Sequence, residues 1–255
     1  MATRVLPSDE TFAQTYARLA TSQKGARGAP AYSRFVNRKL GRLLATIAFR
    51  IGLTPNGVTA ISALLTFSAI ALLLTVPPSA GLGIAVAAGL VLGYAFDSAD
   101  GQLARLRGGG SLVGEWLDHM VDSVKVASLH LAVLVGLYRF TDVPDAWLLV
   151  PLGASAVGSV LFFAMILNDQ LRHRGGAVPR STADGTRAPV LRSLLVVPTD
   201  YGLLCLVFAF YGATTAFLAA YTLLFVATAG YLVLACVSWY REISALDRPA
   251  VPGHG

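Results

Sequence analysis

The sequence predicts an all-α, polytopic membrane protein with six transmembrane helices, and two observations support this prediction. Of its 255 residues, 55% are hydrophobic and only 13% are charged, which is too little charge to cover a soluble domain of this size. Residues 57–96 and 201–240 each contain no Lys, Arg, Asp or Glu, and each is twice as long as one spanning helix requires. Each stretch is therefore predicted to form a helical hairpin, and two further apolar runs bring the count to six.

The spans are expected at about 57–76, 80–104, 112–138, 146–167, 194–211 and 214–238. Gly and Pro punctuate helices, so Pro77-Pro78 is the predicted turn of the first hairpin and the neighbourhood of Gly212 that of the second. We divide the chain into a variable cytoplasmic segment (1–32), a membrane domain (33–240) and a cytoplasmic tail (241–255).

Basic residues predict the orientation, because Lys and Arg in short flanking loops favour the cytoplasmic side. With these spans, eighteen of the twenty Lys and Arg residues fall on one side. Both termini are therefore expected to be cytoplasmic, in a multi-pass protein of the cell membrane. The first residues lack an apolar signal-peptide core, so the spans themselves are expected to direct insertion.

Residues 34–52 have the pattern of an amphipathic helix that precedes the first span. At 100° per residue one face is apolar and the other carries Arg34, Arg38, Lys39 and Arg42. We interpret this segment as a juxtamembrane helix lying on an anionic membrane surface. The alternative is an ordinary amphipathic helix packed against the protein.

Four aspartates stand out at the junction of the second and third spans. Asp97 and Asp100 lie near the end of the second span, and Asp118 and Asp122 lie in the third, each pair at the spacing of helical neighbours. Residues 108–110 are three glycines that break the helix, and Ser111 can cap the next one. The two halves of the motif are therefore predicted to face each other across a tight hairpin.

Four converging carboxylates repel one another unless cations, protons or Arg105 neutralise them. Mg²⁺ or Mn²⁺ suits such hard oxygen ligands, and two ions could clamp a diphosphate while a P–O bond is exchanged. The alternative is an ion or proton transporter, but transport predicts acids distributed through the membrane depth. Clustering at one hairpin favours a phosphoryl-transfer enzyme.

Two further features are ambiguous. Lys125 lies inside the third span and could pair with Asp122 or face a polar cavity. The loop from Asn168 to Thr199 is rich in arginine, which can be topogenic charge or a site for a phosphorylated substrate. Our candidates for binding the acceptor are Arg180, Arg187 and Arg192.

The motif resembles the signature of the CDP-alcohol phosphotransferases, membrane enzymes that move a phosphoryl-linked group from a CDP-alcohol to an acceptor hydroxyl and release CMP. The resemblance covers about residues 33–240, including Pro55-Asn56 before the first span. The matching positions are Asp97, Asp100, Gly101, Ala104, Arg105, Gly114, Asp118 and Asp122.

The resemblance implies a role for each position. Asp97, Asp100 and Asp118 are expected to hold a divalent metal, while Asp122 shares a second metal and serves as the general base. Arg105 is expected at the diphosphate. The residues expected to border the cytidine are Gly101, Ala104 and Gly114.

The donor implied is CDP-diacylglycerol, because a site at the membrane boundary can admit acyl chains between helices. The arginine-rich loop favours inositol phosphate or glycerol phosphate as the acceptor, in phospholipid biosynthesis. A soluble donor such as CDP-inositol, and an inactive membrane scaffold, are the alternatives. A homodimer is implied by the family, and no nucleic-acid partner is expected.

Overall fold

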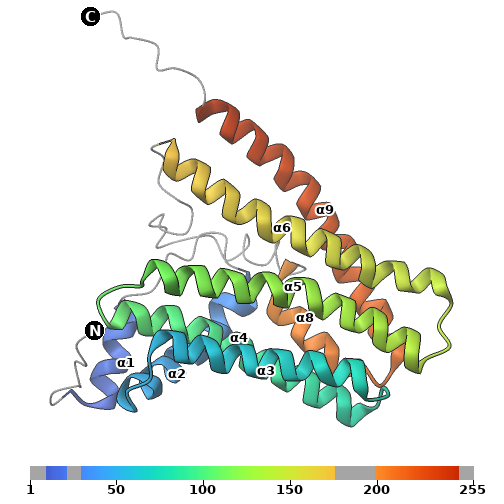
Figure 1. Ribbon diagram of the computed structural model, residues 1–255, viewed down its shortest axis with the longest axis horizontal. Coiled ribbons are helices and arrows are strands. Elements are labelled where there is room, and N and C mark those ends of the chain that lie inside the picture. Colours follow the sequence, from blue (N-terminus) through green and yellow to red (C-terminus); the bar gives the residue numbers. More distant parts are fainter. Residues whose placement is uncertain (1–9, 22–29, 176–198, 247–255) are drawn as a thin grey trace, which may run out of the picture.

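The computed structural model describes residues 10–21, 30–175 and 199–246, and every regular element within them is helical (Figure 1). The long helices are α3 (Pro55–Thr75), α4 (Ala80–Leu106), α5 (Leu112–Phe140), α6 (Leu149–Arg174) and α9 (Thr214–Leu246). The shorter elements are α1 (Phe12–Thr21), the π-helical turn η1 (Ser33–Asn37), α2 (Arg38–Arg50), η2 (Asp145–Leu148), α8 (Tyr201–Val207) and η4 (Phe208–Phe210).

Five of these helices, counted within the described residues, are long and apolar enough to cross a membrane. The span predicted at 194–211 differs, since its first residues lie outside the described part and the rest forms a short apolar helix over Tyr201–Phe210. Ten residues are about half the length that a single crossing requires. The all-helical membrane fold is confirmed, while the six-span count and the side of the termini stay predictions.

The spanning helices expose large apolar side chains, as a lipid environment requires. Examples from four of them are Leu64, Ile84, Phe163 and Leu223, each more than 60% exposed. A soluble monomer rarely exposes apolar surface on this scale. The protein is therefore a membrane protein.

In Figure 1, α3, α4 and α5 run side by side, while α6 and α9 lie next to each other and cross the bundle obliquely. A buried core joins them, and its largest side chains are Phe208, Tyr211, Phe217 and Tyr221. The turns predicted at Pro77-Pro78 and near Gly212 are confirmed, because each lies between two consecutive helices.

Helix α2 lies against the end of α4 that precedes the α4–α5 turn. Contact is close at Gly41, where an added Cβ would come within 2.6 Å of Ser98 Oγ and 2.8 Å of Gln102 Nε2. Only a residue without a side chain permits this approach. The Gln102 amide also donates a hydrogen bond of 3.2 Å to the Arg38 carbonyl, which ties the two helices together.

The apolar stripe of the juxtamembrane segment points away from the protein. Five of its six residues, Val36, Leu40, Leu43, Ile47 and Ile51, are between 37% and 66% exposed, and only Leu44 packs partly against the core. The face against α4 consists largely of small residues. A helix that used this stripe for protein packing would bury it. The structure therefore favours the membrane-surface interpretation of this helix.

Candidate active site

The α4–α5 turn brings the two halves of the aspartate motif together. Gly108 and Gly109 adopt φ values of 94° and 131°, a backbone conformation that glycine tolerates and other residues rarely adopt. Ser111 then caps α5, its hydroxyl accepting a hydrogen bond of 3.0 Å from the Gly114 amide. The predicted hairpin is therefore confirmed, with its breaker and its cap at the expected residues.

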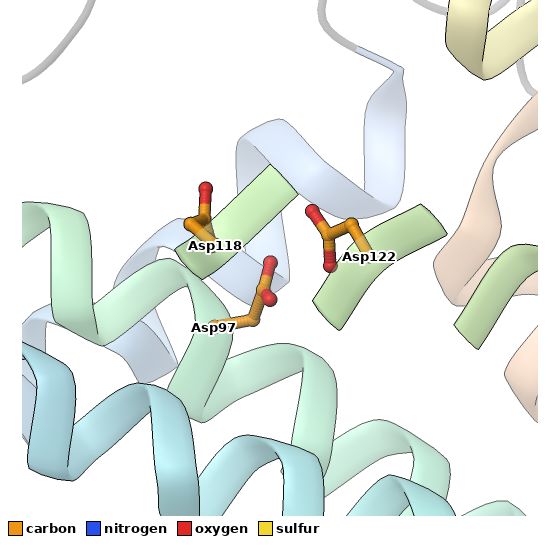
Figure 2. Close-up of side chains that lie close together, drawn as sticks. All are labelled: Asp97, Asp118 and Asp122. Atoms are coloured by element: carbon orange, nitrogen blue, oxygen red, sulfur yellow. The ribbon is translucent and has the colours of Figure 1, made fainter. Parts of the chain in front are cut away.

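Three of the four aspartates converge. One carboxylate oxygen from each of Asp97, Asp118 and Asp122 lies within 4.8 Å of the other two. Figure 2 shows the Asp97 carboxyl of α4 directed into the space between the two aspartates of α5. Their side chains are 20%, 34% and 27% exposed, so the cluster is open to ligands but largely screened from solvent.

This donor set suits a hard divalent cation. Two oxygens bound to one Mg²⁺ at about 2.1 Å lie up to about 4.2 Å apart. Ligand atoms within 4.8 Å of one another therefore need only small side-chain movements to share an ion. Within the described residues, this trio is the group of His, Cys, Asp and Glu side chains that can hold a metal.

Asp100 lies outside this trio. Its Oδ2 accepts a hydrogen bond of 2.6 Å from the hydroxyl of Thr59 on α3, and both residues are buried, at 7% and 4% exposure. The sequence suggested four convergent carboxylates, but the structure groups three and directs the fourth to α3. The reason is that α3 packs along α4 and offers a buried hydroxyl, which the spacing of the aspartates could not reveal.

Lys125 joins the two helices of the cluster. Its ammonium lies 2.7 Å from Asp122 Oδ1 on its own helix and 2.7 Å from Asp97 Oδ1 on α4. The pairing with Asp122 was one of the two possibilities left open by the sequence and is confirmed. The contact with Asp97 was not foreseen, because it depends on how α4 and α5 face each other.

The expected nucleotide-binding positions lie on facing parts of the same hairpin. A Cβ added at Gly101 would meet nothing closer than Arg105 Nη1 at 3.6 Å, so the arginine lies over a surface without a side chain. Ala104, the next small residue of α4, is half-buried. On α5, a Cβ at Gly114 would approach Asn56 Oδ1 at 3.1 Å, which places the start of α3 against this end of the hairpin.

Positive charge gathers beside the carboxylates. Arg38 of α2 lies near enough to Arg105 for the two guanidinium charges to repel each other. Arg38 lies outside the spans, and burial lowers the pKa of its guanidinium group. Tyr94 raises this pKa, and the positive charge of Arg34 lowers it further. Arginine nevertheless stays protonated in proteins. Two neighbouring guanidinium groups are suited to bind a diphosphate.

A family model described as CDP-alcohol phosphatidyltransferase matches residues 52–240, which include the whole hairpin. The chain belongs to this family. The resemblance inferred from the aspartate motif is thereby confirmed, over about the same part of the chain. The family resemblance assigns metal, nucleotide and base roles to the motif positions, and these assignments stay predictions for the individual residues.

Two proteins from other organisms are similar to this chain. The phosphatidylinositol phosphate synthase of Corynebacterium glutamicum is 37% identical over 103 residues, which cover 40% of this chain and only 45% of that relative. The phosphatidylinositol phosphate synthase of Mycobacterium tuberculosis has been solved in apo form, with 25% identity and a TM-score of 0.50 over 81% of this chain and 99% of that one.

The same mycobacterial enzyme has been solved in two other states. Its complex with manganese and citrate is 26% identical, with a TM-score of 0.49 over 83% of this chain and 94% of that one. Its form with CDP-DAG bound is 25% identical, with a TM-score of 0.49 over 85% and 99% of the two chains.

The sequence predicted three acceptor residues and gave little indication of the role of Asp200 in the fold. The candidate acceptor residues Arg180, Arg187 and Arg192 lie outside the described residues. Asp200 was missed: its carboxylate caps α8 through the Gly202 amide at 3.0 Å and accepts a 2.7 Å hydrogen bond from the Tyr32 amide. Its only sequence signal is an acidic residue just before an apolar run.

An apolar cavity of about 250 Å³ lies between α5, α6, α8 and α9. Val126 and His130 of α5 are among its lining residues, and Val126 lies one helical turn beyond Asp122. The His130 ring nitrogen Nδ1 lies 2.5 Å from the Tyr221 hydroxyl, so these two polar groups satisfy each other. The other lining residues are mostly aliphatic or aromatic.

Proposed function

We propose that this member of the CDP-alcohol phosphatidyltransferase family transfers the phosphatidyl group of CDP-diacylglycerol to inositol phosphate and releases CMP. The acceptor is inferred from the two similar proteins, which are both phosphatidylinositol phosphate synthases. The apolar cavity next to the cluster supports a lipid donor, because acyl carbons could enter it while the nucleotide stays at the membrane boundary.

The observation that carries the proposal is the carboxylate trio at the hairpin of the matched family domain. Asp97, Asp118 and Asp122 supply hard oxygen ligands from two helices, held at a spacing that one or more divalent cations can use. A bound Mg²⁺ or Mn²⁺ would neutralise the charge that develops on the phosphoryl oxygens. Asp100, buried against Thr59, would contribute to the metal site through its second oxygen.

The remaining steps fall to the side chains of this chain. Arg105 and Arg38 would orient the diphosphate, and the bare surface at Gly101 would admit the cytidine, with Gly114 at its border. The acceptor hydroxyl oxygen forms the new bond to the phosphorus that carries the diacylglycerol. The bond between that phosphorus and the CMP oxygen breaks, and Asp122 takes the hydroxyl proton as general base.

The proposal also includes the membrane in which the protein lies and the side that its active site faces. Because the basic residues flank one side of the spans, the hairpin would face the cytoplasm from the cell membrane. The exposed apolar stripe and the arginines of the juxtamembrane helix would hold α2 at that surface. A homodimer, expected from the family, belongs to the proposal.

The test is CMP release by purified protein supplied with CDP-diacylglycerol, Mn²⁺ or Mg²⁺, and a panel of acceptors. We expect release with inositol phosphate, and loss of activity after EDTA treatment or in the Asp118→Asn variant. The panel includes glycerol phosphate, and a parallel assay replaces the lipid donor with CDP-inositol.

Each outcome bears on a separate part of the proposal. Activity only with glycerol phosphate, or only with CDP-inositol, would refute the acceptor or the donor while keeping the reaction class. CMP release that is insensitive to EDTA and to substitution of each of the four aspartates would refute the metal-assisted reaction. No CMP release from any pair would refute the enzymatic function.

A further inference from the structure

We propose that His130, held in place by Tyr221, donates a hydrogen bond to an ester carbonyl oxygen of the lipid donor and so distinguishes ester-linked from ether-linked donors. The inference rests on the proposed transfer from CDP-diacylglycerol and deepens it, because the carboxylate trio accounts only for the phosphoryl end of that donor. Neither His130 nor Tyr221 belongs to the aspartate motif.

His130 and Tyr221 form a polar pair in the wall of the mostly apolar cavity. The histidine belongs to α5 and the tyrosine to α9, and His130 Nδ1 lies 2.5 Å from the Tyr221 hydroxyl. Tyr221 is only 1% exposed, so its hydroxyl proton needs an acceptor inside the protein, and Nδ1 is that acceptor. The two rings also meet edge to face, with their centroids 5.8 Å apart, which fixes the orientation of the imidazole.

The second ring nitrogen of His130 is left as a donor. A neutral imidazole carries its proton on one nitrogen, so Nε2 bears the hydrogen when Nδ1 accepts from the phenol. A Cβ added at Gly158 would lie 3.6 Å from Nε2, so this nitrogen faces a position of α6 that has no side chain. Among the residues that the structure describes, Nε2 has no hydrogen-bond partner. A donor left unpaired in an apolar cavity is costly, so the site suits a ligand that brings an acceptor.

The donor nitrogen lies along the helix that carries two members of the trio. Asp118, Asp122, Val126 and His130 follow one another at four-residue spacing, which places them along one ridge of α5. The rise from Asp122 to His130 is about 12 Å. Val126, between them, lines the cavity, so the ridge leads from the carboxylates to the histidine along the cavity wall.

A glycerolipid has suitable dimensions for this path. Six bonds of about 1.5 Å join the phosphorus to the carbonyl oxygen of the nearer ester, which can therefore lie up to about 7 Å from the phosphorus. A hydrogen bond of about 3 Å extends this reach to about 10 Å. A phosphorus held beside Asp122 thus brings the carbonyl within reach of Nε2, while the acyl chain enters the cavity of about 250 Å³. An ether-linked lipid can follow the same path but has no carbonyl oxygen to accept the hydrogen bond.

The experiment measures the Kd of two lipids for the purified full-length protein in detergent, with Mg²⁺ and without acceptor. The lipids are CDP-diacylglycerol and a CDP-dialkylglycerol with chains of the same length. We expect the wild type to bind the ester-linked lipid about two- to tenfold more tightly, which is the effect of one hydrogen bond between neutral groups. A histidine that only filled space would give the two lipids the same affinity.

Three variants test the assignment. His130→Phe keeps a ring without a donor and should bind both lipids equally. Tyr221→Phe removes the proton that Nδ1 accepts, so Nε2 is no longer fixed as the donor and the preference should decrease. Ser155→Ala is the matched control, because the Ser155 hydroxyl also links α6 to α5, through the Ala127 carbonyl at 3.2 Å, but does not line the cavity. It should keep the wild-type preference.

Equal affinity of the wild type for the two lipids would overturn the inference, even if His130→Phe does not fold. A preference that persists in His130→Phe would overturn it too, and one that persists undiminished in Tyr221→Phe would overturn the role of Tyr221. Binding of neither lipid would overturn the inference together with the lipid donor. Because the measurement contains no acceptor, CMP release in the transfer assay without any ester preference would leave the proposed function intact.

Discussion

Replacing Thr59 by Val removes the hydrogen bond to Asp100 with little change in side-chain volume. The hydroxyl donates at 2.6 Å to Asp100 Oδ2, and the two residues are 4% and 7% exposed, so water cannot easily replace the lost donor. We expect the Asp100 carboxylate to lose its fixed orientation at the edge of the metal cluster, and divalent-cation binding to weaken as a result.

The size of the effect follows from burial and charge. A hydrogen bond to a charged group contributes about 1.5–3 kcal/mol, and leaving a buried acceptor unsatisfied costs a similar amount. If this free energy appears in metal binding, the apparent Mn²⁺ affinity falls about 10- to 100-fold. The thermal midpoint in detergent should also fall, because the α3–α4 contact loses its buried polar link.

The assay is Mn²⁺-dependent CMP release, together with thermal unfolding of the same preparations. Thr59→Ser keeps the hydroxyl and should stay close to wild type. Thr66→Val is the matched control, since Thr66 is also buried on α3 but lies two turns away, against Gly93. Wild-type Mn²⁺ dependence and an unchanged midpoint in Thr59→Val would refute the assignment of a positioning role to Thr59.

Three other predictions concern the hairpin and its supports. Gly101→Ala should fold normally, because the added Cβ has space. It should raise the KM for the CDP donor by about tenfold or more by intruding on the cytidine, whereas Gly81→Ala on the same helix should change neither the folding nor this KM. Arg105→Lys should also raise the donor KM about tenfold through loss of bidentate phosphate contact, and an unchanged KM would place the diphosphate elsewhere. Leu19→Ala, at a fully buried position, should destabilise the docking of α1 by about 2–5 kcal/mol, measured as faster hydrogen exchange in residues 12–21 with little change in α5.

Much of the membrane architecture follows from the sequence, because long uncharged runs have few alternatives in a bilayer. The five long helices begin and end within a few residues of the expected limits, except that α6 and α9 extend further at their C-terminal ends. There, Arg172 and Glu242 form an ion pair between the two helices. The predicted limits marked the ends of the apolar runs, and both helices continue past these limits into segments that carry charge.

The segment near Asp200 shows the limit of reasoning from hydropathy. Residues 201–240 are uncharged throughout, yet only α9 is long enough to span, and the part before Gly212 forms a short helix. Composition counts apolar residues but does not fix where a helix begins. Here the start is set by Asp200, whose contacts with Tyr32 and Gly202 depend on chain segments far apart in sequence.

The sequence by itself determined the helical class, the hairpin and the identity of the aspartates that could hold a metal. These features depend on residues close together in the chain: the spacing of the aspartates along each helix, the glycines that break the helix and the serine that caps the next one. Only the tertiary structure decided how those aspartates divide. Three face one another, and two of these, Asp97 and Asp122, pair with Lys125, while Asp100 turns to Thr59. That division depends on which helices pack together, and helix packing is governed by contacts between residues that no local pattern connects.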